Sequence, residues 1–161
     1  MRLRRSPGSL SGIQAPPSPN EPLSRGPPGA VIRIGGGGRA CDDAYVTTVL
    51  IVDDHPTFRA TARAVLEAEG FDVVGEAADG AAALEAVRSL RPDVVLLDVQ
   101  LPDTDGFEVA ARMTANGVGP AVVLTSSRDA ADFGPLVFQS GARGFVPKAE
   151  LCGAAIAALL R

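Results

Sequence analysis

Short apolar runs alternate with amphipathic stretches from Val46 to the end of the chain, and this alternation constrains the fold most strongly. The runs have the length and apolar content of strands, whereas the stretches between them repeat apolar residues at helical spacing. The expected strands are VTTVLIV (46–52), FDVVGEA (71–77), DVVLLD (93–98), AVVLTS (121–126) and GFVP (144–147). The expected helices begin near Pro56, Gly80, Gly106 and Phe133, and a fifth runs from about Glu150 to the end.

Strict alternation of strands and helices calls for a parallel sheet. Neighbouring parallel strands need a crossover connection, and right-handed crossovers place helices on both faces of the sheet. The runs at 93–98 and 121–126 are almost continuously apolar, as burial on both faces requires. We therefore expect one doubly wound α/β domain over residues 46–161, with its functional site at the carboxyl ends of the strands.

Residues that favour helix starts and ends flank most of the expected helices. The fourth helix is the exception, because Gly134 and Pro135 would fall inside a helix that begins at 130. We expect this helix to begin late, near Asp132, and to be short. Elsewhere the start signals are Pro56, Asp79 and Asp105, and the stop signals are Gly70, Gly117 and Gly141.

Residues 1–45 differ in composition from the rest of the chain. Pro, Gly, Ser and Arg dominate, and such a segment cannot bury enough apolar surface to offset its ordering entropy. We expect a disordered extension. It holds 6 Arg against 3 acidic residues, whereas residues 46–161 hold 9 basic against 16 acidic residues, a net charge of −7. An acidic folded domain argues against direct DNA binding.

Neither membrane insertion nor export is indicated by the sequence. No run approaches ~18 consecutive apolar residues, and the start MRLRRSPGSLSG lacks the apolar core of a secretory signal. The two cysteines, Cys41 and Cys152, lie far apart without a CxxC spacing, which favours a reduced compartment. We therefore expect a cytoplasmic protein.

Polar side chains gather where the expected strands end. Asp53 and Asp54 follow the first strand, Asp98 ends the third, Thr125 lies near the end of the fourth, and Lys148 follows the fifth. Converging carboxylates repel one another unless a cation joins them, and all-oxygen ligation suits Mg²⁺. A hydroxyl and an ammonium nearby suit contacts with a phosphoryl group. One of the carboxylates is then free to act as the nucleophile that accepts this group.

Four segments, in this order, resemble the signature segments of response-regulator receiver domains. They are VLIVDDHP, DVVLLDVQLPDTDGFEVA, VVLTSS and GFVPK, and the resemblance covers residues 46–161. It implies the flavodoxin-like (βα)5 fold, with a five-stranded parallel sheet in the order 2-1-3-4-5. It also implies signal transduction by phosphorelay, in which a sensor histidine kinase or a phosphotransfer protein donates a phosphoryl group and Mg²⁺ is the cofactor.

The resemblance also implies roles for the acidic residues. Asp98 resembles the phosphoacceptor, which is at the same time a ligand of Mg²⁺. Asp54 resembles the acid that binds the metal directly, and Asp53 resembles its partner that acts through water. The backbone carbonyl of Gln100 stands where the family has a further metal ligand.

Three more residues match positions that respond to phosphorylation in the family. Thr125 and Lys148 resemble the residues that contact the phosphoryl group, and Phe145 resembles the aromatic switch residue. The resemblance implies that the face made by the fourth helix, fifth strand and fifth helix changes on phosphorylation. This face would pass the signal to a protein target or through self-association. Such a domain is a phosphoacceptor switch and not an enzyme acting on other substrates.

The position of the chain end bears on output. Because the fifth helix would finish near Arg161, we expect no output domain in this chain. The VDDHP and GFVPK forms nevertheless resemble receivers that carry a helix-turn-helix domain downstream. A truncated relative and a stand-alone form therefore both stay open.

Simpler interpretations stay open for several residues. Asp53 and Asp54 suit caps of the first helix, and His55 suits the surface. Asp103 and Asp105 suit shaping and capping of the loop that enters the third helix. Ser126 and Ser127 suit loop hydroxyls, and Cys152 suits a small buried residue. Gln100 and Ala149 differ from the residues that are frequent at these positions in the family.

Two other functional classes compete with a switch. Small phosphohydrolases of similar architecture also use an Asp nucleophile, but they carry a DxD pair after the first strand, whereas the candidate here follows the third. A receiver-like module that is never phosphorylated is disfavoured by the acids together with Thr125 and Lys148. Turnover of phosphate esters would distinguish a phosphohydrolase from a switch. Stable labelling with a phosphoryl group would distinguish a switch from a module that is never phosphorylated.

Overall fold

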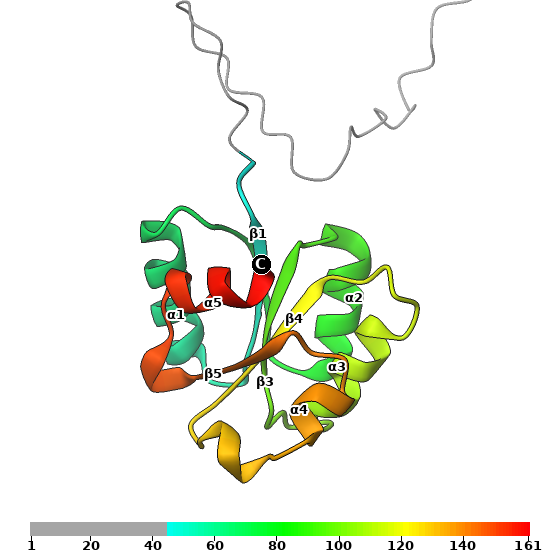
Figure 1. Ribbon diagram of the computed structural model, residues 1–161. Helices are drawn as coiled ribbons and strands as arrows, with labels where there is room; N and C mark the ends of the chain where they lie inside the picture. The colour runs from blue at the N-terminus through cyan, green and yellow to red at the C-terminus, as the bar shows by residue number, and fades with distance from the viewer. Residues whose placement is uncertain (1–44) are drawn as a thin grey trace, which may run out of the picture.

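The computed structural model describes residues 45–161, which form a five-stranded parallel sheet between two layers of helices (Figure 1). The strand order is β2-β1-β3-β4-β5, so the predicted flavodoxin-like fold is confirmed. The extension predicted at 1–45 lies, apart from its last residue, outside the described residues. The strands are β1 (Thr48–Val52), β2 (Asp72–Ala77), β3 (Val94–Asp98), β4 (Ala121–Ser126) and β5 (Gly144–Pro147).

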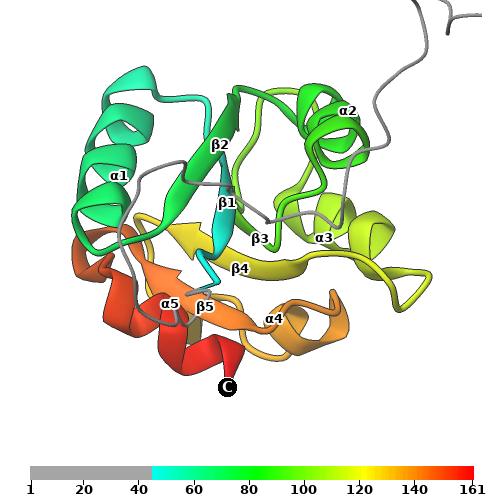
Figure 2. The same cartoon turned by 90° about the horizontal axis from the view of Figure 1, so that it is seen from above.

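Helices cover both faces of the sheet, with α1 and α5 on one face and α2 and α3 on the other (Figure 2). Leu66 of α1 and Ile156 of α5 belong to one apolar core, whereas Ala83 of α2 and Val109 of α3 belong to the other. The central strand β3 is buried throughout, which explains its continuous apolar run. The helices are α1 (Pro56–Ala68), α2 (Gly80–Leu90), α3 (Gly106–Thr114), α4 (Leu136–Gln139) and α5 (Gly153–Leu160).

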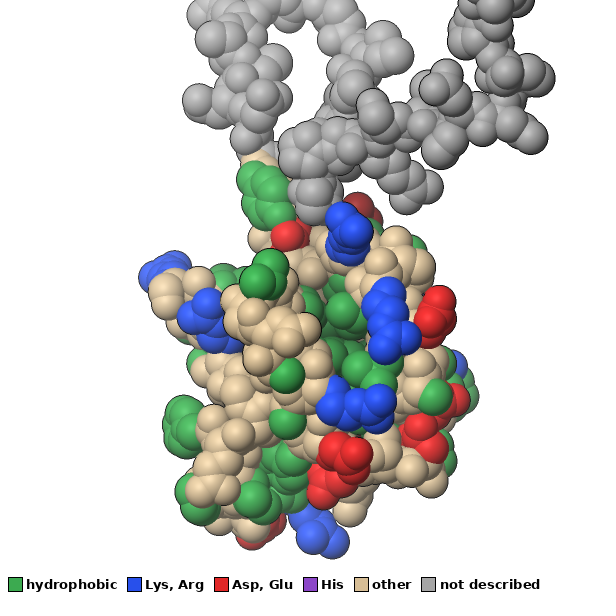
Figure 3. Space-filling model, turned by 90° about the vertical axis from the view of Figure 1, so that its right-hand side faces the viewer, with side chains coloured by type: hydrophobic (Ala, Val, Ile, Leu, Met, Phe, Trp, Pro, Cys, Tyr) green, Lys and Arg blue, Asp and Glu red, His purple; other side chains and the backbone are tan. Residues whose placement is uncertain are grey.

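The outer sides of α2 and α3 are charged, with basic and acidic side chains near one another (Figure 3). Glu85 and Arg88 of α2 are exposed while Ala83 is buried, and Arg112 of α3 is exposed while Val109 is buried. This division follows the helical spacing of the sequence. Among residues 45–161, no helix has both the length and the apolar character needed to span a membrane.

The predicted helix signals are confirmed. Asp79 accepts a hydrogen bond from the Ala82 N–H at 2.7 Å, and Asp105 accepts one from the Phe107 N–H at 2.8 Å. Pro56 occupies the first turn of α1, where its missing N–H costs nothing. The glycines predicted to end helices, all with left-handed φ angles, are Gly70, Gly117 and Gly141.

Asp103 has a different role from the one expected. Its carboxylate accepts hydrogen bonds from the backbone N–H groups of Gly80 at 2.8 Å and Ala81 at 3.0 Å. The hydrogen bond from Gly80 has the larger effect, and together the two bonds hold the pKa of Asp103 below its usual range. Asp103 therefore caps α2 and ties the loop after β3 to the start of that helix.

The segment between β4 and β5 is less helical than predicted. A 3-10 turn, η1 (Ala130–Asp132), comes first, and Gly134 then adopts a φ of +52°. Pro135 follows as the N-cap, so α4 begins only at Leu136. The helix is short, as predicted, but it begins later because the left-handed Gly134 interrupts the helical path.

Strand β1 and helix α5 also begin later than predicted. Thr48 is the first residue of β1 that pairs with β2. After β5, the 3-10 turn η2 (Lys148–Glu150) is followed by Leu151 and Cys152 in extended conformations, so α5 begins at Gly153. Leu151 packs against the core beneath α1, which favours the extended path, and Cys152 is half-buried instead of buried.

Gly106 begins α3 against the loop that follows Asp98. A β-carbon here would lie 2.2 Å from the Asp98 carbonyl oxygen and 2.8 Å from the Val99 Cα. At Gly80, which begins α2, the nearest obstacle is instead the side chain of Thr104. Helix propensity favours Ala over Gly by about 1 kcal/mol, whereas forcing an atom into a packed site costs about 1–3 kcal/mol.

We predict that Gly106→Ala lowers the free energy of unfolding by about 1–2 kcal/mol, because backbone atoms cannot move aside and the gain in helix propensity offsets only part of the cost. Gly80→Ala, the matched control at the start of another helix, should cost less because the atoms in its way belong to side chains, those of Thr104 and Val109, and not to the backbone. Urea denaturation followed by circular dichroism measures both variants. A Gly106→Ala protein as stable as the wild type would contradict the close approach of α3 to this loop.

Candidate functional site

The carboxyl ends of the strands meet at one edge of the sheet, and four polar residues converge there. Asp53 follows β1, Asp98 ends β3, Thr125 pairs with Asp98 across β3 and β4, and Lys148 follows β5. Asp53 is 0% exposed and Asp98 is 3% exposed, and Thr125 is fully buried. The structure thus brings together residues that the sequence singled out. Because Asp53 and Asp98 are buried, their charges need a compensating partner.

Lys148 compensates the charge of the two buried carboxylates. Its Nζ lies 2.5 Å from the Asp53 Oδ2 and 2.7 Å from the Asp98 Oδ2. The ammonium also lies 4.6 Å from the centroid of the Phe58 ring, within range of a cation–π interaction. Only 14% of the lysine side chain is exposed, so these three contacts dominate its surroundings.

The ionisation of Asp98 and Lys148 depends on this cluster. Burial raises the pKa of Asp98, and the hydrogen bonds from Lys148 and from the Gln100 N–H offset only part of the increase. Burial by itself acts to lower the pKa of Lys148, but its close contacts with the Asp53 and Asp98 carboxylates outweigh it and raise that pKa. The ammonium therefore stays charged, while the Asp98 carboxylate lacks the stabilisation it would have in water.

His55 lies closer to the site than the sequence suggested. Its side chain is 70% exposed, as expected for a surface residue, yet its Nδ1 lies 2.6 Å from Asp54 and 3.2 Å from Asp53. Its backbone N–H also donates to the Asp53 Oδ1 at 2.8 Å. The signal available in the sequence was its place directly after the two acids.

The acidic cluster fits a divalent cation. Ligand atoms of Asp53, Asp54, His55 and Asp98 all lie within 4.8 Å of one another. The Asp53 Oδ2 is buried and, among the described residues, accepts no hydrogen bond of good geometry, although it contacts Lys148. An under-satisfied carboxylate oxygen beside other carboxylates is the donor set that Mg²⁺ prefers.

Gln100 and Thr125 lie at the site, but their hydrogen bonds do not test the roles predicted for them. The Gln100 N–H donates to the Asp98 Oδ1 at 3.1 Å, and metal ligation by its carbonyl stays a prediction. The Thr125 hydroxyl donates to the Val146 carbonyl at 2.7 Å and is therefore engaged with β5. Its contact with a phosphoryl group likewise stays a prediction.

Phe145 packs in a row of aromatic rings. Its ring centroid lies 5.6 Å from that of Phe133, which in turn lies 5.5 Å from that of Phe107 in an edge-to-face arrangement. The row joins β5, the segment before α4, and α3. Phe145 is half-buried, so its side chain has both a packed side and a side open to solvent.

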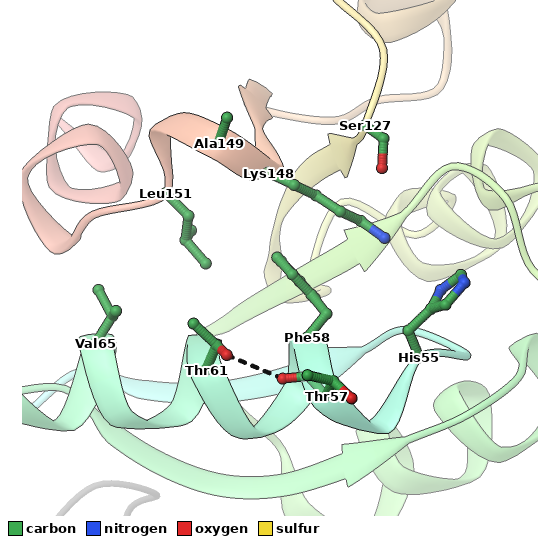
Figure 4. Close-up of a pocket in the computed structure, with 9 residues that line it drawn as sticks. All are labelled: His55, Thr57, Phe58, Thr61, Val65, Ser127, Lys148, Ala149 and Leu151. Carbon is green, nitrogen blue, oxygen red and sulfur yellow. Dashed lines mark hydrogen bonds between the residues drawn. The ribbon is translucent and has the colours of Figure 1, made fainter.

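A groove of about 620 Å³ opens beside the acidic cluster, between α1 and the segment after β5 (Figure 4). Phe58 and Val65 line it from α1, and Leu151 lines it from the opposite side. Lys148 and His55 lie at one end of the groove, as Figure 4 shows, and both contact the acids. The groove therefore joins an apolar trough to the polar site.

Comparison with known proteins identifies similar domains. A family model described as the response regulator receiver domain matches residues 49–158. The DNA-binding response regulator MtrA of Mycolicibacterium smegmatis is 44% identical over 108 residues, which are 66% of this chain and 46% of that protein. This chain spans about half the length of the curated relatives that it matches.

Solved structures give the same result. The signal receiver domain of the response regulator NarL from Mycobacterium tuberculosis matches with a TM-score of 0.64 at 37% identity, over 71% of this chain and 97% of that one. A CheX–CheY–BeF3–Mg²⁺ complex from Borrelia burgdorferi matches with a TM-score of 0.64 at 25% identity, over 73% of this chain and 90% of that one.

The double ion pair predicts the effect of removing Lys148. Lys148→Ala leaves the buried carboxylates of Asp53 and Asp98 without a cation, which costs up to about 3–5 kcal/mol in the free energy of unfolding. Added Mg²⁺ should stabilise this variant more than the wild type, because the ion no longer competes with an ammonium. Thermal unfolding in EDTA and in excess Mg²⁺ measures the difference.

The matched control is Arg88→Ala, which removes an exposed cation paired with Glu85 at 3.8 Å. We expect this control to change stability by less than about 1 kcal/mol and to respond to Mg²⁺ like the wild type. An equal response to Mg²⁺ in Lys148→Ala and wild type would argue against a shared position for the ammonium and the ion.

Proposed function

The chain belongs to the response-regulator receiver family, and we propose that it is a switch whose Asp98 receives a phosphoryl group from a sensor histidine kinase or a phosphotransfer protein. The observation that carries the proposal is the buried Asp98 carboxylate, held 2.7 Å from Lys148 beside two further acids. Residues 46–161 form the receiver in this proposal, and residues 1–45 precede it as an extension.

The proposed reaction is the transfer of a phosphoryl group to a carboxylate oxygen. An oxygen of Asp98 attacks the phosphorus, the P–N bond to the donor imidazole breaks, and its electron pair leaves with the imidazole nitrogen. Lys148 turns from the carboxylates toward a phosphoryl oxygen and offsets its charge. Mg²⁺ would be held by Asp54, Asp98 and the Gln100 carbonyl and through water by Asp53, and it would supply further positive charge at the phosphoryl oxygens.

The proposed response starts from Thr125. Its hydroxyl now donates to the Val146 carbonyl, and a phosphoryl oxygen on Asp98 offers a charged acceptor in place of that neutral one. Movement of Thr125 would release β5 next to Phe145, whose ring packs on Phe133. The face made by α4, β5 and α5 would then change, and a protein target or a second copy would bind it.

The position of the nucleophile favours a switch over a phosphohydrolase. The central acid, Asp98, ends β3, whereas the pair after β1 consists of the adjacent residues Asp53 and Asp54. We assign the phosphoryl exchange to the cytoplasm, in keeping with a sequence that holds two cysteines far apart and without a CxxC spacing. Output through direct DNA binding by residues 46–161 is not part of the proposal, because this region carries a net charge of −7.

The groove beside the acidic cluster suits the phosphodonor. Lys148 and His55, which contact the acids, lie at one end of the groove, so a donor imidazole at Asp98 would stand beside that end. The protein that carries the imidazole would then cover the adjoining apolar trough of Phe58, Val65 and Leu151 (Figure 4). Burial of such a trough provides affinity, while the polar end aligns the reacting groups.

Labelling with a small phosphodonor tests the proposal. With acetyl phosphate and Mg²⁺, the wild type should gain one phosphoryl group in intact-mass spectra, and Asp98→Ala should gain none. Asp54→Ala should bind Mg²⁺ at least about tenfold more weakly, because it loses a ligand that binds the ion directly. Asp72→Ala, an exposed acid at the start of β2, is the control and should label like the wild type. Labelling that persists in Asp98→Ala would refute the proposal.

A second experiment tests the role of the groove. Thr61 is exposed and lines the groove, whereas Ala64 is exposed on the same helix and does not line it. Sensor histidine kinases are first screened for phosphotransfer to this chain. Thr61→Glu should then slow transfer from the kinase so identified, because a charge lies in the trough that the partner covers. Ala64→Glu adds the same charge outside the groove and should transfer normally. Both should label normally with acetyl phosphate, and equal transfer rates from the kinase would exclude the groove as its docking site.

A further inference from the structure

Arg59, on the first turns of α1, links three parts of the structure behind the acidic cluster. Its Nη1 donates a hydrogen bond to the Asp53 backbone carbonyl at 2.7 Å, and its Nε pairs with Glu76 of β2 at 3.0 Å. The side chain is only 18% exposed. One guanidinium therefore connects α1, β2 and the loop between β1 and α1.

Glu76 is a firm anchor for this link. Arg63 pairs with it at 2.8 Å, so two guanidinium groups bind one carboxylate. The hydrogen bond from Arg63, opposed in part by burial and reinforced by Arg59, lowers the pKa of Glu76. The backbone beside Glu76 is also tied to the loop, because the Asp53 N–H donates to the Ala77 carbonyl at 3.0 Å.

The carbonyl that Arg59 binds belongs to the peptide unit between Asp53 and Asp54. The orientation of this unit determines where the two carboxylates point, since each side chain is attached directly beside it. The Ala77 carbonyl holds the Asp53 N–H on one side, and Arg59 holds the Asp53 carbonyl on the other. The two bonds together restrain rotation of the loop about Asp53.

We propose that Arg59 is a positioning residue of the metal site, which orients the carboxylates of Asp53 and Asp54 through its two-point bridge from the Asp53 carbonyl to Glu76. The inference rests on the proposed function, because it assigns Arg59 to the same Mg²⁺ site. In this arrangement Arg59 would contact neither the metal nor the phosphoryl group. It acts as outer-shell partners of metal ligands generally do, and their loss typically costs about 10–100-fold in metal affinity.

Electrostatics and positioning predict opposite signs for the loss of Arg59. Its positive charge near the site repels a cation, so removing the charge without other consequences would tighten Mg²⁺ binding. Loss of the bridge would instead weaken Mg²⁺ binding, because the carboxylates would have to be ordered when the ion binds. The direction of the change therefore distinguishes the two effects.

Arg63 provides a matched control. It binds the same Glu76, and it also donates to a backbone carbonyl, that of Val73, at 3.0 Å. It differs from Arg59 in two ways: no hydrogen bond or ion pair joins it to Asp53, and its side chain is more exposed, at 35%. Arg63→Gln therefore removes one arginine from the same carboxylate and spares the loop that carries the acids.

The test is Mg²⁺ binding by calorimetry to the full chain, for wild type, Arg59→Gln, Arg59→Lys and Arg63→Gln. We expect the dissociation constant of Arg59→Gln to rise about tenfold, and that of Arg63→Gln to match the wild type. Arg59→Lys should also bind Mg²⁺ more weakly than the wild type, because a single ammonium lacks the fork that spans two acceptors. Urea denaturation without Mg²⁺ should show similar stability for Arg59→Gln and Arg63→Gln.

His55, the only histidine in the chain, supplies a second readout. Because its Nδ1 lies 3.2 Å from Asp53, its ring signals in NMR spectra report the position of that carboxylate. In the absence of Mg²⁺ these signals should move in Arg59→Gln and stay in place in Arg63→Gln. This measurement requires neither phosphorylation nor a bound metal.

The outcomes separate the inference from the function on which it rests. Mg²⁺ binding by Arg59→Gln that equals or exceeds that of the wild type would overturn the positioning role, as would equal weakening in Arg63→Gln or full recovery in Arg59→Lys. A wild type that neither binds Mg²⁺ nor labels with acetyl phosphate would overturn the proposed function and this inference with it.

Discussion

The need to compensate two buried carboxylates at the end of the sheet organises this structure. Asp53 and Asp98 follow or end neighbouring strands, so their charges are close together and largely removed from water. The cation that offsets them, Lys148, comes from beyond β5, which pairs with neither β1 nor β3. Its long side chain must pass the end of β4, and the ring of Phe58 supports the ammonium. An uncompensated pair would be costly enough to disfavour the fold.

This arrangement joins the chemistry of the site to the edge of the sheet. Lys148 connects Asp98 to the end of β5, and the Thr125 hydroxyl connects β4 to the Val146 carbonyl in the same strand. Phe145 of β5 in turn packs on Phe133. A change of charge at Asp98 would therefore act on β5 through two polar contacts, and β5 carries the aromatic side chain that packs against the segment before α4. Two discrete packings of that ring would suffice for a switch.

The backbone around the acids is held on both sides. Behind Asp98, the first residue of α3 is Gly106, and its N–H donates to the Val99 carbonyl at 2.8 Å. Within that loop, Asp103 caps α2 and so ties the loop to the start of that helix. On the β1 side, Arg59 holds the Asp53 carbonyl. Rigid support of this kind keeps carboxylates in place despite their mutual repulsion, which is a condition for binding a small, geometrically demanding ion.

The sequence by itself determined the elements and the kinds of chemistry at their ends. Strand and helix periods, caps such as Asp79, and acids placed after apolar runs are local signals, which depend on residues a few positions apart. The tertiary structure decided the partners. The binding of Asp103 to α2, of the Thr125 hydroxyl to β5 and of Lys148 to Asp53 depends on which strands adjoin and where each side chain points. Such choices join residues distant in sequence, and no local pattern records them.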